Sequence, residues 1–238
     1  LGPIEIGGIW HQIQEKNTLN KFDDSAIRLH KVYRNRGALA KLSKVLREEG
    51  TQKFLQQLSQ LPETENLHIS YSSLNSLPPL VLDNLKAKSR NLNKLAQGLA
   101  LDLKENFDEL VSDSNSYGKV VDDLFECLEN LLVLCPKRRG TWSIDHIHKS
   151  LLGGKLHEGV CSWPEGTPVM CSENQPELGL SNGDVGIAIG IGNQRRIVFR
   201  IFSNQQVLST CLIHPARLRK IEPALAITIH KAQGSEAN

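Results

Sequence analysis

The sequence predicts an α/β protein whose main sheet is parallel, and three stretches of the chain support this. Residues 26–29 are predicted to form a strand, and residues 38–46 follow it with helical spacing. Strand, loop and helix in this order are the building unit of an α/β sheet. Residues 131–135 and 225–228 are near-continuous apolar runs, which are typical of strands buried on both faces of a parallel sheet.

Helical spacing dominates the next part of the chain. The apolar face of the helix over residues 38–46 consists of Leu39, Leu42 and Leu46. From residue 51 to residue 123 the chain becomes rich in Gln, Asn, Ser, Leu and Lys, and leucines recur at helical spacing between residues 80 and 110. Such a stripe favours a helix packed against a core rather than a partner-binding zipper. We interpret residues 51–123 as a mainly helical insert.

The α/β pattern returns after this insert. Ser143 is a good N-cap for a helix through Leu151, because its hydroxyl can accept a backbone N–H of the first helical turn. Gly153 is expected to end that helix. We therefore assign residues 124–180 to the same α/β domain that residues 1–50 begin.

Residues 181–222 have a different character. Asn182 and Gly183 form a turn signal, and short β-rich runs separated by polar links follow it. These runs are residues 185–191, 196–202 and 207–213. Strands joined by tight turns predict a small antiparallel barrel of the SH3-like kind, inserted before the α/β pattern resumes at residue 223.

Composition narrows the function classes. The 238 residues carry a net charge of +2, which does not by itself indicate nucleic acid. No apolar stretch is long enough for a membrane span, and the chain starts without Met or a signal-peptide pattern, which indicates an excised cytoplasmic piece. The five cysteines form no C-x-x-C pair and are expected to be reduced. We expect no metal site, since His146 and His148 would point to different faces of a helix.

The closing residues carry the most chemistry. An apolar, β-branched run ends at Thr228, and a turn containing His230, Lys231, Gln233, Gly234 and Glu236 follows. In α/β proteins the carboxyl ends of parallel strands hold phosphates and nucleic acid. The pattern therefore predicts a binding edge at this turn.

The string Thr-Ile-His-Lys-Ala-Gln-Gly-Ser-Glu over residues 228–236 also resembles a known motif. It is similar to motif V of the superfamily 1 helicases that move 5′→3′, in the form found in the RecD family. Ser235-Glu236 favours RecD over Pif1-like relatives, while Ala232 stands where that family generally has Ser. Other segments resemble the family in the same order, with a weak match over residues 51–123. These segments are residues 1–7, 29–34, 134–140, 166–170, 182–186 and 215–218.

The resemblance implies a fold and an activity. Residues 1–50, 124–180 and 223–238 would form a RecA-like domain of the P-loop NTPase type, called 2A, and residues 181–222 an SH3-like barrel, called 2B. The implied function is the C-terminal motor region of an ATP-dependent 5′→3′ DNA helicase, the exodeoxyribonuclease V alpha subunit. Such proteins act in double-strand-break repair and recombination. Single-stranded and duplex-end DNA would be bound, with RecB and RecC type subunits as partners and no membrane.

ATP and Mg²⁺ are implied as well, held mainly by a first motor domain. No G-x-x-x-x-G-K-[ST] phosphate-binding loop occurs in the chain. We therefore expect the chain alone neither to hydrolyse ATP nor to unwind DNA.

The nucleotide contacts implied by the resemblance begin with Arg34, the expected catalytic residue. Its planar, permanently charged guanidinium suits the γ-phosphate across a domain cleft, whereas a surface arginine is the alternative. Gly234 would let the backbone approach the nucleotide, Glu236 would accept a hydrogen bond from the ribose, and Gln233 would link nucleotide and DNA.

The expected DNA contacts are Thr228, His230, Lys231 and Asn182, since hydroxyl, imidazole and ammonium groups suit phosphate oxygens. For His230 the alternative is a core histidine, and for Asn182 a purely structural turn. Two further pairs are left open. Trp142 and Trp163 either stack on bases or pack, with packing favoured, and the charges at residues 195–196 either contact DNA or form a solvated hairpin tip.

Three other functions remain to be compared. A free-standing RecD-like helicase would carry the same residues. A non-catalytic scaffold that binds DNA or protein would use the barrel and the helical insert. An independent nuclease lacks support, because no acidic cluster with metal-ligand spacing occurs.

Overall fold

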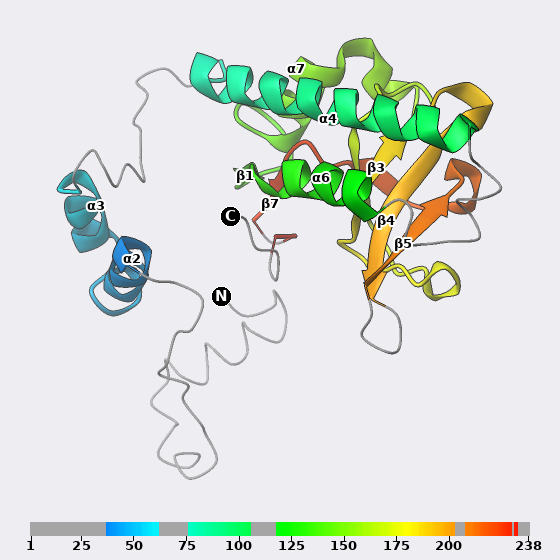
Figure 1. The fold of residues 1–238 in the computed structure, drawn as a ribbon. Helices are drawn as coiled ribbons and strands as arrows, with labels where there is room; N and C mark the ends of the chain where they lie inside the picture. Colours follow the sequence, from blue (N-terminus) through cyan, green and yellow to red (C-terminus); the bar gives the residue numbers. More distant parts are fainter. Residues whose placement is uncertain (1–36, 62–75, 106–117, 203–207, 230, 233–238) are drawn as a thin grey trace, which may run out of the picture. The chain divides into compact units, whose positions relative to one another are not determined.

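The chain divides into two compact units, Leu1–Ser70 and Tyr71–Asn238. The computed structural model describes residues 37–61, 76–105, 118–202, 208–229 and 231–232. The strand predicted over residues 26–29 therefore lies outside the described residues. In the second unit the helices and strands form a mixed α/β fold with one parallel and one antiparallel sheet (Figure 1).

The first unit contains the helices α2 (Gly37–Glu48) and α3 (Thr51–Ser59). The predicted helix and its end near Gly50 are confirmed, because Gly50 has a φ of 86° that a helix cannot continue. Its buried face differs from the prediction. Leu42 and Val45 are buried, one helical turn apart, whereas Leu46 is 45% exposed.

The second unit is built on a five-stranded antiparallel sheet with the order β5-β4-β3-β2-β6. Its strands are β2 (Pro168–Cys171), β3 (Val185–Ile189), β4 (Arg196–Phe202), β5 (Leu208–Ile213) and β6 (Ile221–Pro223). The predicted hairpin order is confirmed, with Ile187 opposite Val198 in β3 and β4. The sheet also takes in β2, which pairs with both β3 and β6 and precedes the segment predicted as a barrel.

Strand β3 ends two residues earlier than predicted, for a local reason. Gly190 has a φ of 69°, and a Cβ there would lie 2.6 Å from the carbonyl oxygen of Gln194. The backbone leaves the sheet at this glycine and forms a short 3₁₀ helix, η6 (Gly192–Gln194), before β4. Similar single turns occur elsewhere in the second unit: η4 (Gly153–His157), η5 (Pro176–Leu178) and η7 (Pro215–Arg217).

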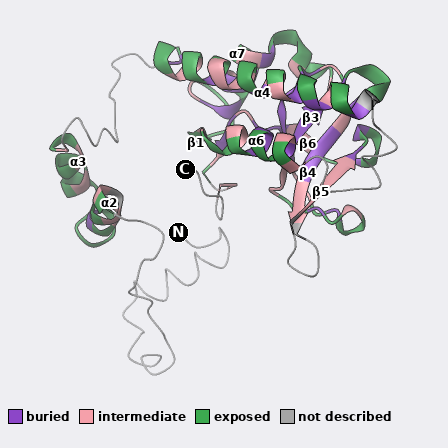
Figure 2. Cartoon of the chain, in the orientation of Figure 1, coloured by how far each residue is buried: buried purple, intermediate pink, exposed green. Residues whose placement is uncertain are grey.

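Side chains alternate along each strand, and each face of the antiparallel sheet has its own apolar cluster. Figure 2 shows the buried residues along β4 in purple. On one face, β3 and β4 pack against α4 (Pro79–Glu105) and α6 (Gly118–Glu129). On the other face, Ala188, Ile197 and Phe199 pack with Leu152 and Trp163. Complete burial of one leucine or phenylalanine side chain stabilises the fold by about 1.5–3 kcal/mol. The predicted packing role of the leucine stripe is confirmed.

The parallel sheet is a pair of two-residue strands, β1 (Leu134–Cys135) and β7 (Ile227–Thr228). The parallel direction of the two strands was predicted and is confirmed. The prediction that both faces of the strands are buried was wrong. Cys135 is buried while Leu134 is 44% exposed. Only the last two residues of the predicted 131–135 strand form ladder pairs, so the pair is shorter than the apolar run suggested.

Helix α7 (Ile144–Leu152) follows β1 and confirms the predicted cap. The Ser143 hydroxyl accepts the backbone N–H of His146 at 3.2 Å, and Gly153 ends the helix with a φ of 56°. Among the described helices, none combines the length and the apolar character required to cross a membrane.

Candidate nucleic-acid site

The candidate site lies where β1 and β7 end. Because the strands are parallel and paired, Cys135 beside Thr228, the segments that leave them start at the same edge of the sheet. Arg138 comes from the loop after β1, and Lys231 comes from the turn after β7. Their cationic side chains both bind the carboxylate of Glu222 on β6. Two positive charges and one negative charge thus meet at the edge predicted to bind phosphate.

Glu222 is the centre of this cluster, which we call the Glu222 cluster: Arg138, Ser172, Glu222 and Lys231. One carboxylate oxygen accepts from Arg138, and the other accepts from Lys231 and from the Ser172 hydroxyl at 2.9 Å. The Lys231 Nζ also donates to the Ser172 Oγ at 3.2 Å. Burial by itself would raise the pKa of Glu222, but the hydrogen bonds from Lys231, Arg138 and Ser172 lower the pKa below its ordinary value.

Thr228 begins the turn that carries Lys231. Its carbonyl oxygen accepts the backbone N–H groups of Lys231 and Ala232 at 3.0 and 3.1 Å. Its hydroxyl oxygen also accepts the Lys231 N–H, at 3.3 Å. A hydroxyl that accepts one hydrogen bond still has its own proton to donate. The Thr228 hydroxyl can therefore donate to a phosphate oxygen at the sheet edge.

His148 supports the start of β7 from α7. Its Nε2 accepts the backbone N–H of Ala226 at 3.4 Å, so this nitrogen carries no proton. Burial lowers the pKa of His148 to about 4, more than the Ala226 contact and the neighbouring carboxylates raise it. His148 is thus neutral near pH 7. Within the part of the chain that the structure describes, no three His, Cys, Asp or Glu side chains are placed to hold a metal ion.

Asn182 lies in the turn that precedes β3. Its backbone N–H donates to the Asn174 side-chain oxygen at 2.8 Å, and Asp184 accepts the Ser181 N–H at 2.7 Å. These hydrogen bonds hold the turn together, in agreement with the alternative prediction that Asn182 is part of a structural turn. The side chain of Asn182 is exposed, so the predicted DNA contact is neither supported nor opposed by this geometry.

Five predicted site residues lie outside the described residues: Arg34, His230, Gln233, Gly234 and Glu236. The structure therefore brings Thr228 and Lys231 together and leaves the nucleotide contacts untested. Sequence reasoning missed the other members of the Glu222 cluster. Arg138 lies in residues 134–140, one of the segments that resemble the RecD family, but no role was assigned to it. It is separated from Glu222 by 84 positions, so no local pattern joins the two residues.

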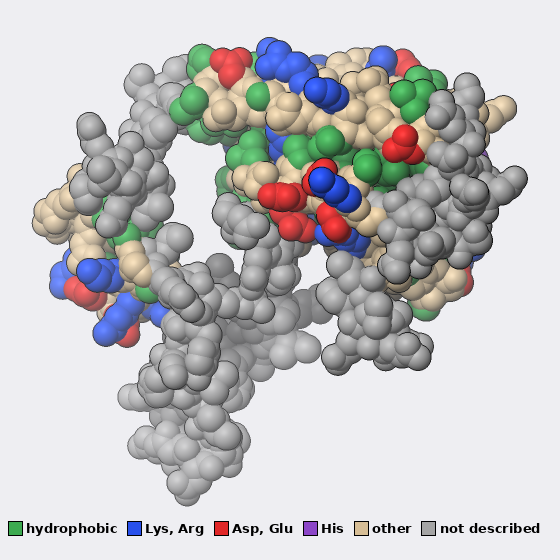
Figure 3. Space-filling view, viewed as in Figure 1, with side chains coloured by type: hydrophobic (Ala, Val, Ile, Leu, Met, Phe, Trp, Pro, Cys, Tyr) green, Lys and Arg blue, Asp and Glu red, His purple; other side chains and the backbone are tan. Residues whose placement is uncertain are grey.

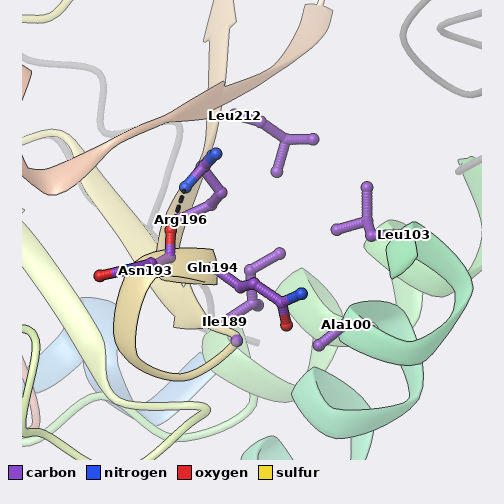
Figure 4. A pocket seen from close by; sticks show the side chains of 8 residues that line it. Ala100, Leu103, Ile189, Asn193, Gln194, Arg196 and Leu212 are labelled. Atoms are coloured by element: carbon purple, nitrogen blue, oxygen red, sulfur yellow. Dashed lines mark hydrogen bonds between the residues drawn. The ribbon is translucent and has the colours of Figure 1, made fainter. Parts of the chain in front are cut away.

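The arginines at residues 195–196 were predicted either to contact DNA or to form a solvated hairpin tip, and Arg195 does neither. Arg195 is 2% exposed and donates to the carbonyl oxygens of Trp163 at 2.5 Å and Cys161 at 3.3 Å. It is a buried structural residue, and burial lowers the pKa of its guanidinium. Arg196 is half-buried and bonds the carbonyl of Asn193 at 3.3 Å (Figure 4). Trp163 is buried, which confirms packing over base stacking.

Two cavities of the second unit are less suited to nucleic acid than the sheet edge. The first, about 260 Å³, lies between α4 and the β3–β4 hairpin and is lined mainly by Leu103, Ile189 and Leu212 (Figure 4). The second, about 440 Å³, borders β7 at Ile227 and is lined mainly by apolar side chains, with the charged groups Lys88, Glu129, Asp184 and Arg200 among them. Burial lowers the pKa of Lys88 to about 8, and its ammonium donates to the carbonyl oxygens of Leu128 and Leu131. Lys88 therefore stabilises the C-terminal end of α6 by binding these carbonyl groups.

Charge also separates the faces of the second unit. Acidic side chains gather over α6 (Figure 3), where Asp122, Asp123, Glu126 and Glu129 are exposed. Arg200 bonds Asp122 and lies 4.7 Å from the ring centre of Phe125. An acidic face repels nucleic-acid phosphates. The sheet edge with its excess positive charge is the better candidate.

No protein-family model matches the chain. Curated proteins named RecBCD enzyme subunit RecD are similar to it. It is 32% identical over 115 residues to that of Mycolicibacterium smegmatis, covering 47% of this chain and 19% of the relative. The chain is 25% identical over 206 residues to the protein of Haemophilus influenzae, covering 83% of this chain and 29% of the relative. It is 24% identical over 156 residues to the protein of Buchnera aphidicola, covering 62% of this chain and 25% of the relative. The chain thus spans less than a third of these relatives, and the predicted resemblance to RecD is confirmed.

Proposed function

We propose that the chain is the DNA-contacting motor region of an ATP-dependent 5′→3′ DNA helicase of the RecD kind. The observation that carries the proposal is the edge at which β1 and β7 end, where Thr228 and Lys231 stand in the motif V-like string. The similarity to curated RecD subunits supports the same reading. In this proposal the β1–β7 pair belongs to a RecA-like sheet, and the five-stranded sheet is an SH3-like barrel.

The DNA contacts would be made to the backbone. Thr228, His230 and Asn182 are proposed to contact phosphates of a single strand, and Lys231 is proposed to belong to the same DNA-binding turn by holding it in place. Contacts to phosphate and sugar position a nucleic acid without reading its sequence. A motor that moves along DNA of any sequence requires this kind of contact. We therefore expect binding that depends strongly on salt and weakly on base composition.

The nucleotide contacts are a further proposal. Arg34 would contact the γ-phosphate, while Gln233, Gly234 and Glu236 would contact ATP from the motif V side. ATP with Mg²⁺ supplies the free energy for movement in such motors. The 238 residues contain no phosphate-binding loop of the G-x-x-x-x-G-K-[ST] type. We propose that the chain alone hydrolyses no ATP and that hydrolysis requires a first motor domain.

The relatives' names suggest the biological setting. A subunit of a RecBCD-type enzyme would work with RecB and RecC type subunits at DNA ends, in double-strand-break repair and recombination in the cytoplasm. A free-standing RecD-like helicase would use the same residues. Unwinding of a duplex with a 5′ tail by the full-length protein alone would favour the free-standing form, and a requirement for partner subunits would favour the complex.

DNA binding by the chain can be measured by fluorescence anisotropy with a labelled thymidine oligonucleotide. The test variant is Thr228→Val, which keeps the shape and removes the hydroxyl. Loss of one hydrogen bond to a charged group should weaken binding about tenfold or more. Thr210→Val is the matched control, since Thr210 lies on β5 opposite Arg200. Equal affinities for wild type and Thr228→Val would contradict the assigned contact.

A further inference from the structure

We propose that Glu222 is a positioning residue: it holds Lys231 against the antiparallel sheet and thereby orients the Thr228 hydroxyl toward DNA. This inference rests on the proposed function for the identity of the ligand. Its structural part rests on the bonds of the Glu222 cluster alone.

Glu222 joins two sheets that share no strand pairing and otherwise meet through the apolar contact of Met170 with Ile227. It lies on β6, opposite Met170 of β2, in the middle of a short strand of the antiparallel sheet. Arg138 and Lys231 follow the two strands of the parallel pair. The carboxylate therefore lies at the junction of the sheets. The antiparallel sheet supplies a rigid support, and the turn after β7 is attached to it through Lys231.

Three side chains of the Glu222 cluster bond one another. Lys231 bonds Glu222 and Ser172, and Ser172 bonds Glu222, so the three side chains form a ring of hydrogen bonds. The Glu222 and Lys231 side chains are only 20% and 22% exposed. A lysine fixed in this way, with its charge balanced by a carboxylate, is better suited to anchor the turn than to neutralise a phosphate.

The anchor acts on the DNA-contacting group through one residue. The same Lys231 whose ammonium binds Glu222 donates its backbone N–H to the Thr228 hydroxyl oxygen at 3.3 Å. This bond fixes the position of the Thr228 hydroxyl oxygen beside the turn and leaves its proton available to donate to a phosphate. The sequence of contacts runs from Glu222 to the Lys231 side chain, then to the Lys231 backbone, and then to Thr228 Oγ1.

A different role would give opposite results. If Glu222 merely competed with phosphate for Lys231, then removing its charge would strengthen DNA binding. If Lys231 neutralised a phosphate directly, then removing Lys231 would lower the slope of log K against log salt by about 0.7 for single-stranded DNA. Positioning predicts weaker binding with an unchanged slope in both variants.

The experiment measures affinity for a labelled thymidine oligonucleotide over a series of KCl concentrations. The variants are Glu222→Gln, Lys231→Met and the double variant. Each single change should weaken binding about tenfold, and the double variant should be no weaker than the singles, since both remove the same anchor. Glu173→Gln is the matched control. It removes the Lys220–Glu173 ion pair of 3.3 Å, which does not contact the turn, and should leave affinity unchanged.

The outcomes separate the two proposals. Failure of the wild-type chain to bind the oligonucleotide would overturn the proposed function. Wild-type binding that Glu222→Gln leaves equal or strengthens would overturn the positioning role alone, as would independent, multiplying losses in the double variant. If Glu222→Gln does not fold, Ser172→Ala replaces it, because it removes one bond of the ring and keeps the carboxylate. In the full-length protein, Glu222→Gln should raise the KM for DNA in ATP turnover and leave kcat unchanged.

Discussion

The antiparallel sheet and the parallel strand pair of the second unit differ in how far polar contacts add to their apolar packing. The sheet is packed on both faces by apolar side chains, with Ile187 and Ile197 fully buried. In the short pair β1–β7, Cys135 and Ile227 are buried in apolar clusters, and hydrogen bonds from the Ala226 N–H to His148 and from Lys231 to Glu222 add to this packing. Apolar burial does not depend on pH or salt in the way that hydrogen-bonded charges do. The candidate site therefore lies on the strand pair whose stability depends on pH and salt, next to a sheet whose stability depends mainly on apolar burial.

The largest expected effect on the free energy of unfolding comes from the packing of α4 against the antiparallel sheet. Leu92 on α4 is fully buried against the sheet, whereas Leu101 on the same helix is 61% exposed. Leu92→Ala should lower the free energy of unfolding by about 2–5 kcal/mol, because it removes buried methyl groups and leaves a cavity. Leu101→Ala should change it by less than about 0.5 kcal/mol. Urea unfolding of both variants checks this, and similar losses would contradict the assigned packing of α4.

The polar support of β7 should respond to pH. The unfolded chain protonates His148 near its ordinary pKa of 6.5, whereas the folded chain protonates it only near a pKa of about 4. The unfolded state thus binds more protons between these values, and stability falls as pH drops through this window. The loss should reach about 3 kcal/mol. Because carboxylates also titrate there, the measured quantity is the difference between wild type and His148→Gln. Parallel pH profiles for the two would contradict this account.

The close contact between α4 and the segment before β2 should tolerate no added side chain. Gly166 has a φ of 79°, and a Cβ there would lie 2.4 Å from the backbone nitrogen of Asn93. Gly166→Ala should destabilise the fold by about 1–3 kcal/mol through overpacking and backbone strain. Gly98 has open space around it within α4, so Gly98→Ala should stabilise by up to about 1 kcal/mol. Thermal unfolding should therefore move in opposite directions for the two variants.

The smallest expected effect concerns the outer charge of the Glu222 cluster. The Arg138 side chain is 52% exposed, so its ion pair with Glu222 should contribute less than about 1 kcal/mol. Arg138→Gln should lower stability slightly at low salt and not at high salt. Because the pKa of Glu222 is lowered, the contribution is present above the ordinary Glu pKa and is lost as pH falls through the lowered pKa. A large loss that persists at high salt would show that Arg138 is more deeply integrated than its exposure indicates.

Local chemistry explains which elements could be predicted from sequence. Strand β4 matches the predicted residues 196–202, because β-branched residues lie between polar turns. The Ser143 cap and the glycine that ends α7 were also predictable, since capping depends on a few adjacent residues. The resemblance to RecD came from the string over residues 228–236, supported by six further segments in the same order, and it is confirmed by the curated relatives.

Long-range contacts explain what could not be predicted. Arg195 looks like surface charge in the sequence, but the carbonyl groups that surround it come from a segment 32 to 34 positions away. The role of β2 in the antiparallel sheet depends on pairing with β6 across 50 positions, as the bond from Ser172 to Glu222 illustrates. The Glu222 cluster arises in the same way. Its members lie in the loop after β1, just after β2, in the middle of β6 and in the turn after β7, and only the fold brings them together.

The most direct test of the central claim is to find which residues touch DNA. A bromodeoxyuridine-substituted single strand bound to the chain can be crosslinked by light and the attached peptides identified by mass spectrometry. We expect crosslinks in the peptides that carry Thr228 and Arg138, because the segments after β7 and β1 share one sheet edge. Crosslinks confined to α6 or to the β3–β4 hairpin, with none at these two peptides, would contradict the assignment of the nucleic-acid site.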